Sequence, residues 1–271
     1  MNTMKATTPI ITLLSDFGLR DAYVAEMKAV MLSISPDACI VDISHEIEKF
    51  NIRMGAFVLA SAVPYFPKGT VHVAVVDPGV GTKRRPIIIE TKRSFYVGPD
   101  NGLLLPSAQK EEGSRVYHVK NSEYMRPKIS TTFHGRDIFA PAAAYLAKGY
   151  SPSQFGPEIQ DYVIPQFAKP YMKRDELIGE VMYMDEFGNV VTNISSRDLE
   201  EQETSIGDLL HVRFGRRKLD MRFCSAYAEV SPRTPLVSVG SHEFLEISVN
   251  QGNASKKLNL KVGDSLGIRF H

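Results

Sequence analysis

The sequence predicts an α/β protein of two domains: an N-terminal domain whose mostly parallel sheet is flanked by helices, and a smaller C-terminal all-β barrel or sandwich. In the first half, continuous apolar segments alternate with segments of helical period, which is typical of parallel strands covered on both faces. After Gly149, short strand-like segments separated by turn residues take over, which indicates a small antiparallel sandwich or barrel. The length of 271 residues also exceeds what one hydrophobic core usually serves.

The elements of the first domain follow from these two periods. The expected strands are residues 10–14, 39–43, 70–76, 86–91, 94–98 and 116–120. The expected helices are residues 20–34, 51–66 and 137–150, the last being rich in alanine despite Pro141 near its start.

The second domain is expected to follow a linker. Residues 150–169 are rich in proline and polar residues, and we interpret part of this stretch as the linker, with domain limits at 1–169 and 170–271. The expected strands beyond it are residues 177–185, 189–194, 209–214, 219–223, 236–240, 244–250 and 266–270.

Composition excludes several classes of partner. The net charge is +1, so the chain favours neither a nucleic-acid backbone nor an acidic membrane surface. The N-terminal segment is too short and polar for a signal peptide, and no apolar run reaches membrane-spanning length, so we predict a cytoplasmic protein. Cys39 and Cys224 both have apolar sequence neighbours and are expected to be buried free thiols.

Acidic residues stand at the carboxyl ends of three of the predicted parallel strands. Asp16, Asp42 with His45, and Asp77 stand at points where ligands gather in open α/β sheets. One such carboxylate could be a helix cap, but three strand ends favour a functional cleft. Asp16 has two acceptor oxygens and could bind both hydroxyls of a ribose, or it could be a turn residue.

A glycine-bearing loop follows the strand that ends at Asp77. Gly79 and Gly81 permit a tight loop, so that Arg84 or Arg85 can fold back to pair with the carboxylate and fix its direction. The alternative is a purely structural ion pair. The spacing does not match a phosphate-binding P-loop.

His134 precedes Gly135 and a predicted helix, with Phe133 beside it. A packed histidine and a catalytic histidine are both compatible with this position. A metal-dependent hydrolase is the less favoured alternative, because no H-x-x-x-H or H-x-H pair would anchor a metal ion.

The second domain has polar and aromatic residues of its own. Asp185, Phe187 and Asn189 lie on a predicted turn, which is either an ordinary hairpin turn or part of a binding site. Aromatic rings with amide and carboxylate groups can hold a purine by stacking and edge hydrogen bonds. The other candidates are Tyr227, Ser241, Glu246 and Asn250.

Taken in order, several segments resemble the S-adenosylmethionine (SAM) hydroxide adenosyltransferase family, the hydrolytic relatives of the SAM-dependent fluorinase and chlorinase. The segments are LLSDFGLRDAYVAEMK, DISHEI, VVDPGVGTKRRP, YVGPDNGLL, TFHGRDIFAPAAA and DEFGNVVTNI. The resemblance covers nearly the whole chain. It implies a parallel α/β N-terminal domain, a β-barrel-like C-terminal domain and a homotrimer with sites between subunits.

The resemblance also implies roles for individual residues. The catalytic set that prepares a water molecule matches Asp77, Arg84 and His134. Asp16 matches the ribose-binding aspartate, and Asp185 matches the carboxylate that holds the methionine ammonium. The remaining substrate-binding residues that we expect are Phe50, Phe133, Phe187, Asn189, Tyr227, Ser241, Glu246 and the backbone of Gln251.

The expected activity is metal-free hydrolysis of SAM by hydroxide attack at C5', giving adenosine and L-methionine, with SAM as substrate and no cofactor. A non-catalytic SAM or adenosine sensor and a chloride-using halogenase are the alternatives. A carboxylate at Asp77 would repel a halide, and halogenases carry a serine where this chain has Gly135, so hydrolysis is favoured. The sequence around Ser241 departs from the family pattern, because His242 and Glu243 add charge beside it.

Overall fold

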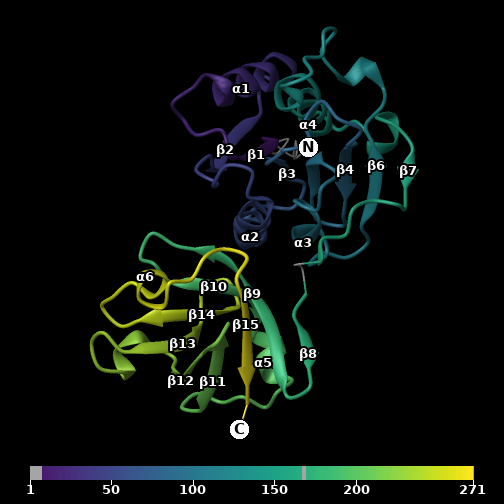
Figure 1. The fold of residues 1–271 in the computed structure, drawn as a ribbon. Coiled ribbons are helices and arrows are strands. Elements are labelled where there is room, and N and C mark those ends of the chain that lie inside the picture. The colour runs from purple at the N-terminus through teal and green to yellow at the C-terminus, as the bar shows by residue number, and fades with distance from the viewer. Residues whose placement is uncertain (1–7, 167–168, 271) are drawn as a thin grey trace, which may run out of the picture. The chain divides into compact units, whose positions relative to one another are not determined.

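The computed structural model describes residues 8–166 and 169–270. The chain divides into two compact units, Met1–Pro165 and Gln166–His271 (Figure 1). The domain limits predicted from the sequence, 1–169 and 170–271, stay a prediction. Within the two described ranges, no helix is both long and apolar enough to cross a membrane.

The first unit is built on a mixed sheet with the strand order β2-β1-β3-β5-β4-β6-β7. Its strands are β1 (Ile10–Ser15), β2 (Cys39–Ser44), β3 (Val71–Val75), β4 (Pro86–Glu90), β5 (Phe95–Pro99), β6 (Arg115–His118) and β7 (Glu158–Ile159). Strands β2, β1, β3 and β5 pair in parallel, whereas β4 pairs antiparallel with β5 and β6, and β7 antiparallel with β6. Only β4 and β7 therefore run against the others, and the predicted mostly parallel sheet is confirmed.

Helices cover both faces of this sheet, α1 and α4 on one and α2 and α3 on the other (Figure 1). The helices are α1 (Tyr23–Ile34), α2 (Ile52–Ala62), α3 (Leu105–Ala108) and α4 (Ala140–Ala147). Single turns are η1 (Val63–Tyr65), η2 (Ser122–Tyr124), η4 (Pro152–Gln154) and η3 (Gly135–Phe139), a π-helical turn that leads into α4. Pro141 lies in the first turn of α4, where a missing N–H is tolerated.

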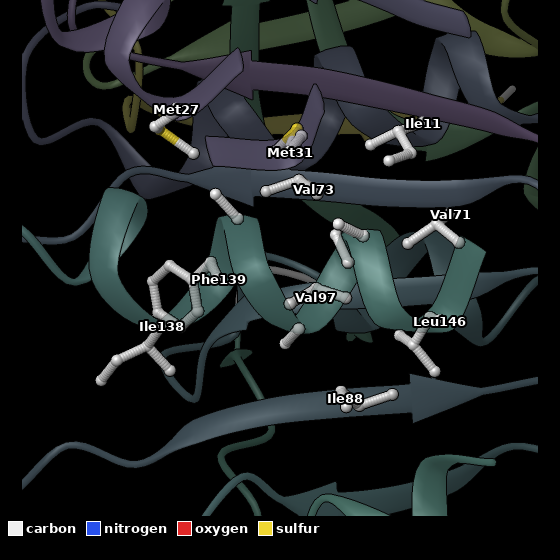
Figure 2. Packing of buried hydrophobic residues seen from close by; sticks show 14 of the residues in the cluster. Ile11, Met27, Met31, Val71, Val73, Ile88, Val97, Ile138, Phe139 and Leu146 are labelled. Atoms are coloured by element: carbon white, nitrogen blue, oxygen red, sulfur yellow. The ribbon is translucent and has the colours of Figure 1, made fainter. Parts of the chain in front are cut away.

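The core of this unit lies between the sheet and the pair α1 and α4. Figure 2 shows the side chains of η3 and α4 facing apolar residues of the strands, with two methionines of α1 beside them. The residues labelled there are Ile11, Met27, Met31, Val71, Val73, Ile88, Val97, Ile138, Phe139 and Leu146. Each such buried side chain stabilises the fold by roughly 1.5–3 kcal/mol, so this packing holds the loops at the strand ends in place.

The second unit is a closed barrel. Its strands are β8 (Tyr171–Lys173), β9 (Glu176–Met184), β10 (Val190–Ser195), β11 (Leu209–Phe214), β12 (Arg217–Phe223), β13 (Pro235–Val239), β14 (Phe244–Val249) and β15 (Ser265–Arg269). The order β10-β14-β13-β12-β11-β15-β9 returns to β10 through the β9–β10 pairing, and β8 extends β9 outside the ring. Helical segments α5 (Ser196–Glu200), η6 (Tyr227–Glu229) and α6 (Ala254–Leu258) connect the strands.

Three details differ from the sequence-based interpretation. Strands β12 and β13 pair in parallel within an otherwise antiparallel barrel. Strand β7 lies inside the stretch that was expected to contain the linker, and it pairs with β6. Both cysteines are free, but only Cys224 is buried, because Cys39 begins β2 at the exposed edge of the sheet.

Candidate active site

The first unit holds a pocket of about 240 Å³ beside the carboxyl ends of β1 and β3. Asp16 directly follows β1, and Asp77 stands two residues after the end of β3. His134 reaches the same pocket from the residue before η3. The pocket therefore lies where the carboxyl ends of parallel strands meet, as the sequence predicted. Its lining residues are Asp16, Phe17, Asp21, Tyr23, Lys49, Phe50, Val75, Asp77, Val80, Thr132, Phe133, His134 and Gly135.

The carboxylate of Asp77 is held by Arg84. Arg84 Nε donates to both Asp77 oxygens at 3.0 Å, and Nη2 donates to Oδ2. The loop between them turns tightly: the Val80 N–H donates to the Asp77 carbonyl at 3.2 Å, and Gly81 adopts a φ of 75° that favours glycine. The arginine that folds back is Arg84, as the sequence analysis expected.

Arg84 also fixes the tautomer of His134. Its Nη2 lies 3.0 Å from His134 Nδ1. Because a guanidinium can only donate, Nδ1 must accept, and the proton of the neutral imidazole is on Nε2. Burial, with the charge of Arg84, holds the pKa of His134 below its usual range, against the opposing influence of Asp77 and Asp137. His134 is therefore a neutral hydrogen-bond donor at the pocket.

Arg84 acts from behind the pocket wall. Asp77 and His134 line the pocket, whereas Arg84 is not among the described residues that do so. The Arg84 side chain is 9% exposed, and its guanidinium carbon lies 5.1 Å from the centre of the Phe139 ring. Arg84 can therefore orient Asp77 and His134 without contacting a small ligand in the pocket.

Asp16 and Phe50 form a second part of the pocket. Asp16 is buried, and its Oδ2 accepts the Phe50 N–H at 2.9 Å, while Lys49 Nζ donates to the Asp16 carbonyl. Phe50 has a φ of 65° and an exposed side chain. Such backbone strain in a non-glycine residue gathers at ligand sites, where surrounding contacts maintain it. The bond to Asp16 is one of these contacts.

Three aromatic rings close one side of the pocket. The centres of Phe17, Tyr23 and Phe133 lie between 5.1 and 5.7 Å apart. Sequence reasoning singled out only Phe133. It missed Tyr23 and Asp21, because their segment has a helical period and was assigned to a helix from residue 20. The helix begins only at Tyr23, so these residues sit at its N-terminal end.

Two polar residues at the end of β2, Asp42 within the strand and His45 just after it, do not line this pocket. Lys28 Nζ donates to Asp42 Oδ2 at 2.6 Å, and His45 bridges Asp42 Oδ1 at 3.1 Å and Ser15 Oγ at 2.8 Å. Burial opposes ionisation of Asp42, but the bonds from Lys28 and His45 outweigh it and lower its pKa. Of the three strand ends singled out, this one forms a separate polar cluster.

The barrel unit carries a second cluster at the turn between β9 and β10. Asp185 Oδ1 accepts the Asn189 N–H at 2.8 Å, and Oδ2 accepts Asn189 Nδ2 at 2.8 Å. Gly188 has a φ of 85°, and a Cβ there would be 2.0 Å from Asn253 Nδ2, so only glycine fits. Phe187 is 81% exposed on this turn.

Tyr227 and Glu246 belong to the same part of the barrel. The Tyr227 hydroxyl donates to Glu246 Oε1 at 2.8 Å, as does Ser248 Oγ at 2.8 Å. Burial, the bond to Glu246 and the charge of Asp185 raise the pKa of Tyr227 to about 12. Strand β10, which follows the Asp185 turn, pairs with β14 at Val191 and Glu246, so the two groups of predicted residues belong to neighbouring strands. Ser241 and Gln251 lie exposed in the turns after β13 and β14.

A search for metal ligands gives no candidate in residues 8–166 and 169–270: no three His, Cys, Asp or Glu side chains gather so as to hold an ion.

Known proteins match both units. The family models for the N- and C-terminal domains of SAM hydroxide adenosyltransferase match residues 11–156 and 179–267. An (R)-S-adenosyl-L-methionine hydrolase from Methanocaldococcus jannaschii is 40% identical over 270 residues and covers 96% of each chain. A fluorinase from Nocardia brasiliensis is 28% identical over 298 residues and covers 99% of each chain. The crystal structure of an uncharacterized conserved protein from Thermotoga maritima has a TM-score of 0.88 and 40% identity, covering 96% of this chain and 99% of that one.

Proposed function

The chain belongs to the SAM hydroxide adenosyltransferase family, and from this premise we propose that it hydrolyses S-adenosyl-L-methionine to adenosine and L-methionine. The observation that carries the proposal is the pairing of a carboxylate and a neutral imidazole at one pocket. Asp77 and His134 both line it, and Arg84 orients both from behind. A site that only bound its ligand would gain nothing from this arrangement.

The reaction needs a water molecule in line with the C5'–sulfur bond. The water oxygen forms a bond to C5', the C5'–sulfur bond breaks, and its electron pair goes to sulfur, which leaves as the neutral thioether of methionine. Water gives up one proton to Asp77 and then to solvent. Holding the three atoms in line can lower the barrier by several kcal/mol, on the order of 7 or more in well-oriented systems.

Each member of the catalytic set has a separate part in this step. Asp77 orients the water and accepts its proton as general base. His134 presents Nε2–H to the attacking oxygen and holds it in position. Arg84 keeps the Asp77 carboxylate turned toward the pocket and, by donating to Nδ1, keeps His134 in the tautomer that carries its proton on Nε2.

The remaining residues would each bind a different part of the substrate. We assign Asp16 to the ribose hydroxyls, and Phe50 and Phe133 to the apolar surface of the substrate. Asp185 would bind the methionine ammonium. The adenine and the methionine tail would be held by Phe187, Asn189, Tyr227, Ser241, Glu246 and the backbone of Gln251. The proposal includes a cytoplasmic homotrimer with sites completed between subunits, which light scattering would test.

The names of the relatives specify the (R) form of the substrate. Because "L" already fixes the methionine carbon, the remaining stereocentre is the sulfonium sulfur. We propose the same preference here. Removal of one sulfonium epimer also gives SAM hydrolysis a purpose that destruction of the whole pool would lack.

Halogenation is the less favoured alternative. The Asp77 carboxylate would repel a halide at the position of the nucleophile. A Cβ at Gly135 would lie 3.1 Å from Met27 Sδ and 3.2 Å from Phe133 Cε2, so a side chain there needs its neighbours to move.

Incubation with each SAM epimer in oxygen-18 water, followed by mass spectrometry, tests the proposal. We expect adenosine with one heavy oxygen and unlabelled methionine, formed faster from the (R) epimer. Label in methionine-derived products would mean attack at another carbon. Unchanged SAM recovered bound to the protein would mean a sensor.

Two further arms of the same experiment test the alternatives. Excess EDTA should leave the rate unchanged, and a loss of activity would revive a metal-dependent mechanism. Added chloride should give no 5'-chloro-5'-deoxyadenosine, whereas its formation would favour halogenation.

A further inference from the structure

A buried carboxylate next to the pocket has no part in the chemistry proposed above. Asp137 lies in η3, three residues after His134, with a side chain that is 0% exposed. Its Oδ2 accepts the Ser130 N–H at 2.8 Å. Arg136 donates to its two oxygens through Nε at 2.7 Å and Nη2 at 3.0 Å, and Arg126 Nη1 lies 3.5 Å from Oδ1.

The main-chain carbonyl of Asp137 holds the same loop. In a continuous α-helix it would accept the N–H four residues onward, but that residue is Pro141, which has none. The Arg126 N–H donates to this carbonyl instead, at 2.9 Å. Asp137 therefore ties the loop of residues 126–134 at two points, Arg126 and Ser130.

This loop forms one wall of the pocket and abuts the Asp77 loop. His134 and its two predecessors line the pocket. The Thr131 carbonyl packs so closely on Gly81 that a Cβ at Gly81 would be 2.3 Å from its oxygen. Gly81 belongs to the loop that joins Asp77 to Arg84. A shift of the anchored loop would therefore displace both catalytic side chains, Asp77 and His134.

Arg136 extends the influence of Asp137 to the aromatic wall. Its Nη1 donates to Glu26 Oε2 of α1 at 2.8 Å, and its guanidinium carbon lies 5.0 Å from the centre of the Phe133 ring. A cation over a ring face is attracted to it, so the Asp137–Arg136 pair also fixes Phe133.

We propose that Asp137 is a positioning residue for the reaction, which holds His134 and Phe133 in their working geometry through the 126–134 loop. The expected loss of kcat rests on the proposed function. The anchoring of the 126–134 loop by Asp137 does not. The π-helical turn fits this role, since such turns are frequent at functional sites.

The test compares Asp137→Asn with Asp100→Asn. Asp100 is a matched control, because its side chain is 4% exposed, it accepts Arg85 Nε at 3.0 Å, and it accepts the Val163 N–H at 2.8 Å. Both variants should lose similar thermal stability. Only Asp137→Asn should lose kcat, on the order of 10²-fold if the reacting groups move by about 1 Å, with little change in adenosine affinity.

The pH profile gives a readout that a purely structural role would not move. The groups that face His134 are Arg84, which lowers its pKa, and Asp77 and Asp137, which raise it. Asp137→Asn should therefore lower the pKa of His134, measured by NMR of its imidazole, and move the acid limb of kcat to lower pH. Asp100→Asn should change neither.

Equal losses of kcat in the two variants, or a kcat for Asp137→Asn close to that of wild type, would overturn the inference. If Asp137→Asn does not fold, Ser130→Pro removes the N–H donor to Asp137 and should lower kcat. Ser130→Ala keeps that donor, loses only the bonds of Ser130 Oγ to Thr132, and should lower kcat much less. If the wild type releases no adenosine, the proposed function fails. The His134 spectrum then decides the anchoring role alone, because an unchanged spectrum in Asp137→Asn would refute it.

Discussion

The polar cluster at the pocket and the polar cluster of the barrel unit are built in opposite ways. In the α/β unit, Asp77 and Arg84 are joined by direct ionic hydrogen bonds, with side chains 5% and 9% exposed, and His134 accepts from the same guanidinium. Taking two charges out of water is expensive, and among the described residues nothing accepts from the buried Arg84 Nη1. A buried network with this cost is typical of a site where a charged group has to point in a fixed direction.

The barrel unit presents open aromatic rings beside carboxylates that accept neutral donors. Phe187 is 81% exposed and Tyr227 is 46% exposed, while Asp185 accepts from the main chain and the side-chain amide of Asn189. Exposed rings and a carboxylate held by an amide suit recognition of a ring and a cation. We therefore expect the pocket cluster to govern kcat and the barrel cluster to govern substrate binding.

The largest effect is expected from Asp77→Asn, which tests whether the pocket cluster governs kcat and not binding. Loss of the general base and of the Arg84 pairing should lower kcat by about 10³-fold, while the affinity for adenosine, measured by calorimetry, persists. Asp42→Asn is the control, since Asp42 lies in another strand of the same sheet, β2, and bonds Lys28 outside the pocket. Lost binding with Asp77→Asn would contradict its assignment to water activation.

The corresponding change in the barrel is Asp185→Asn. A charged hydrogen bond to the methionine ammonium contributes about 1.5–3 kcal/mol, so KM should rise by roughly ten- to a hundredfold, with kcat at saturating substrate nearly unchanged. Asp264→Asn serves as control, because that carboxylate only accepts the Lys261 N–H in a turn of the same barrel. A fall in kcat without a rise in KM would contradict the assignment of the barrel cluster to substrate binding.

A third prediction concerns pH and the Arg84–His134 pair. Burial and Arg84 depress the pKa of His134, so His134 is neutral above its usual value near 6.5, and kcat/KM should fall only as the pH drops below it. Protonation would place an N–H against Arg84 and lose the bond at Nδ1. Arg84→Met removes the depressing charge and should move the acid limb to higher pH.

Imidazole NMR of both proteins would assign this limb. If the acid limb of kcat/KM moved without a matching change in the His134 titration, the limb would belong to another group. His134 would then not have the proposed catalytic role.

Much of the fold was predictable because it depends on local period. The seven strands predicted in the second half all form, and the glycines after β3 correctly indicated that an arginine folds back to Asp77. These features need only the residues within one segment. The closed ring of the barrel and the parallel β12–β13 pair depend on which distant segments meet, and no single segment encodes that.

The candidate site was predictable where a motif carried it and not where the fold alone did. Lys49 lines the pocket and bonds the Asp16 carbonyl, yet only the family resemblance, through its neighbour Phe50, indicated a site in this segment. Cys39 was misread because its neighbours are apolar, whereas its exposure follows from the place of β2 at the sheet edge. Burial is a property of the assembled sheet, so sequence neighbours are a poor guide to it.

The smallest predicted effect is that of Tyr227→Phe, which removes one hydroxyl and keeps the ring. The net contribution of one neutral hydrogen bond is about 0.5–1.5 kcal/mol, so the Kd for adenosine should rise by roughly two- to tenfold while kcat stays close to wild type. Because the pKa of Tyr227 is raised to about 12, the hydroxyl remains a donor to Glu246 through alkaline assay conditions. The Kd difference between the two proteins should therefore not change from neutral pH to well above it. If the Kd difference between wild type and Tyr227→Phe disappeared as the pH rises, the hydroxyl would be ionising in that range. The burial of Tyr227 and its bond to Glu246 would then not raise its pKa as proposed.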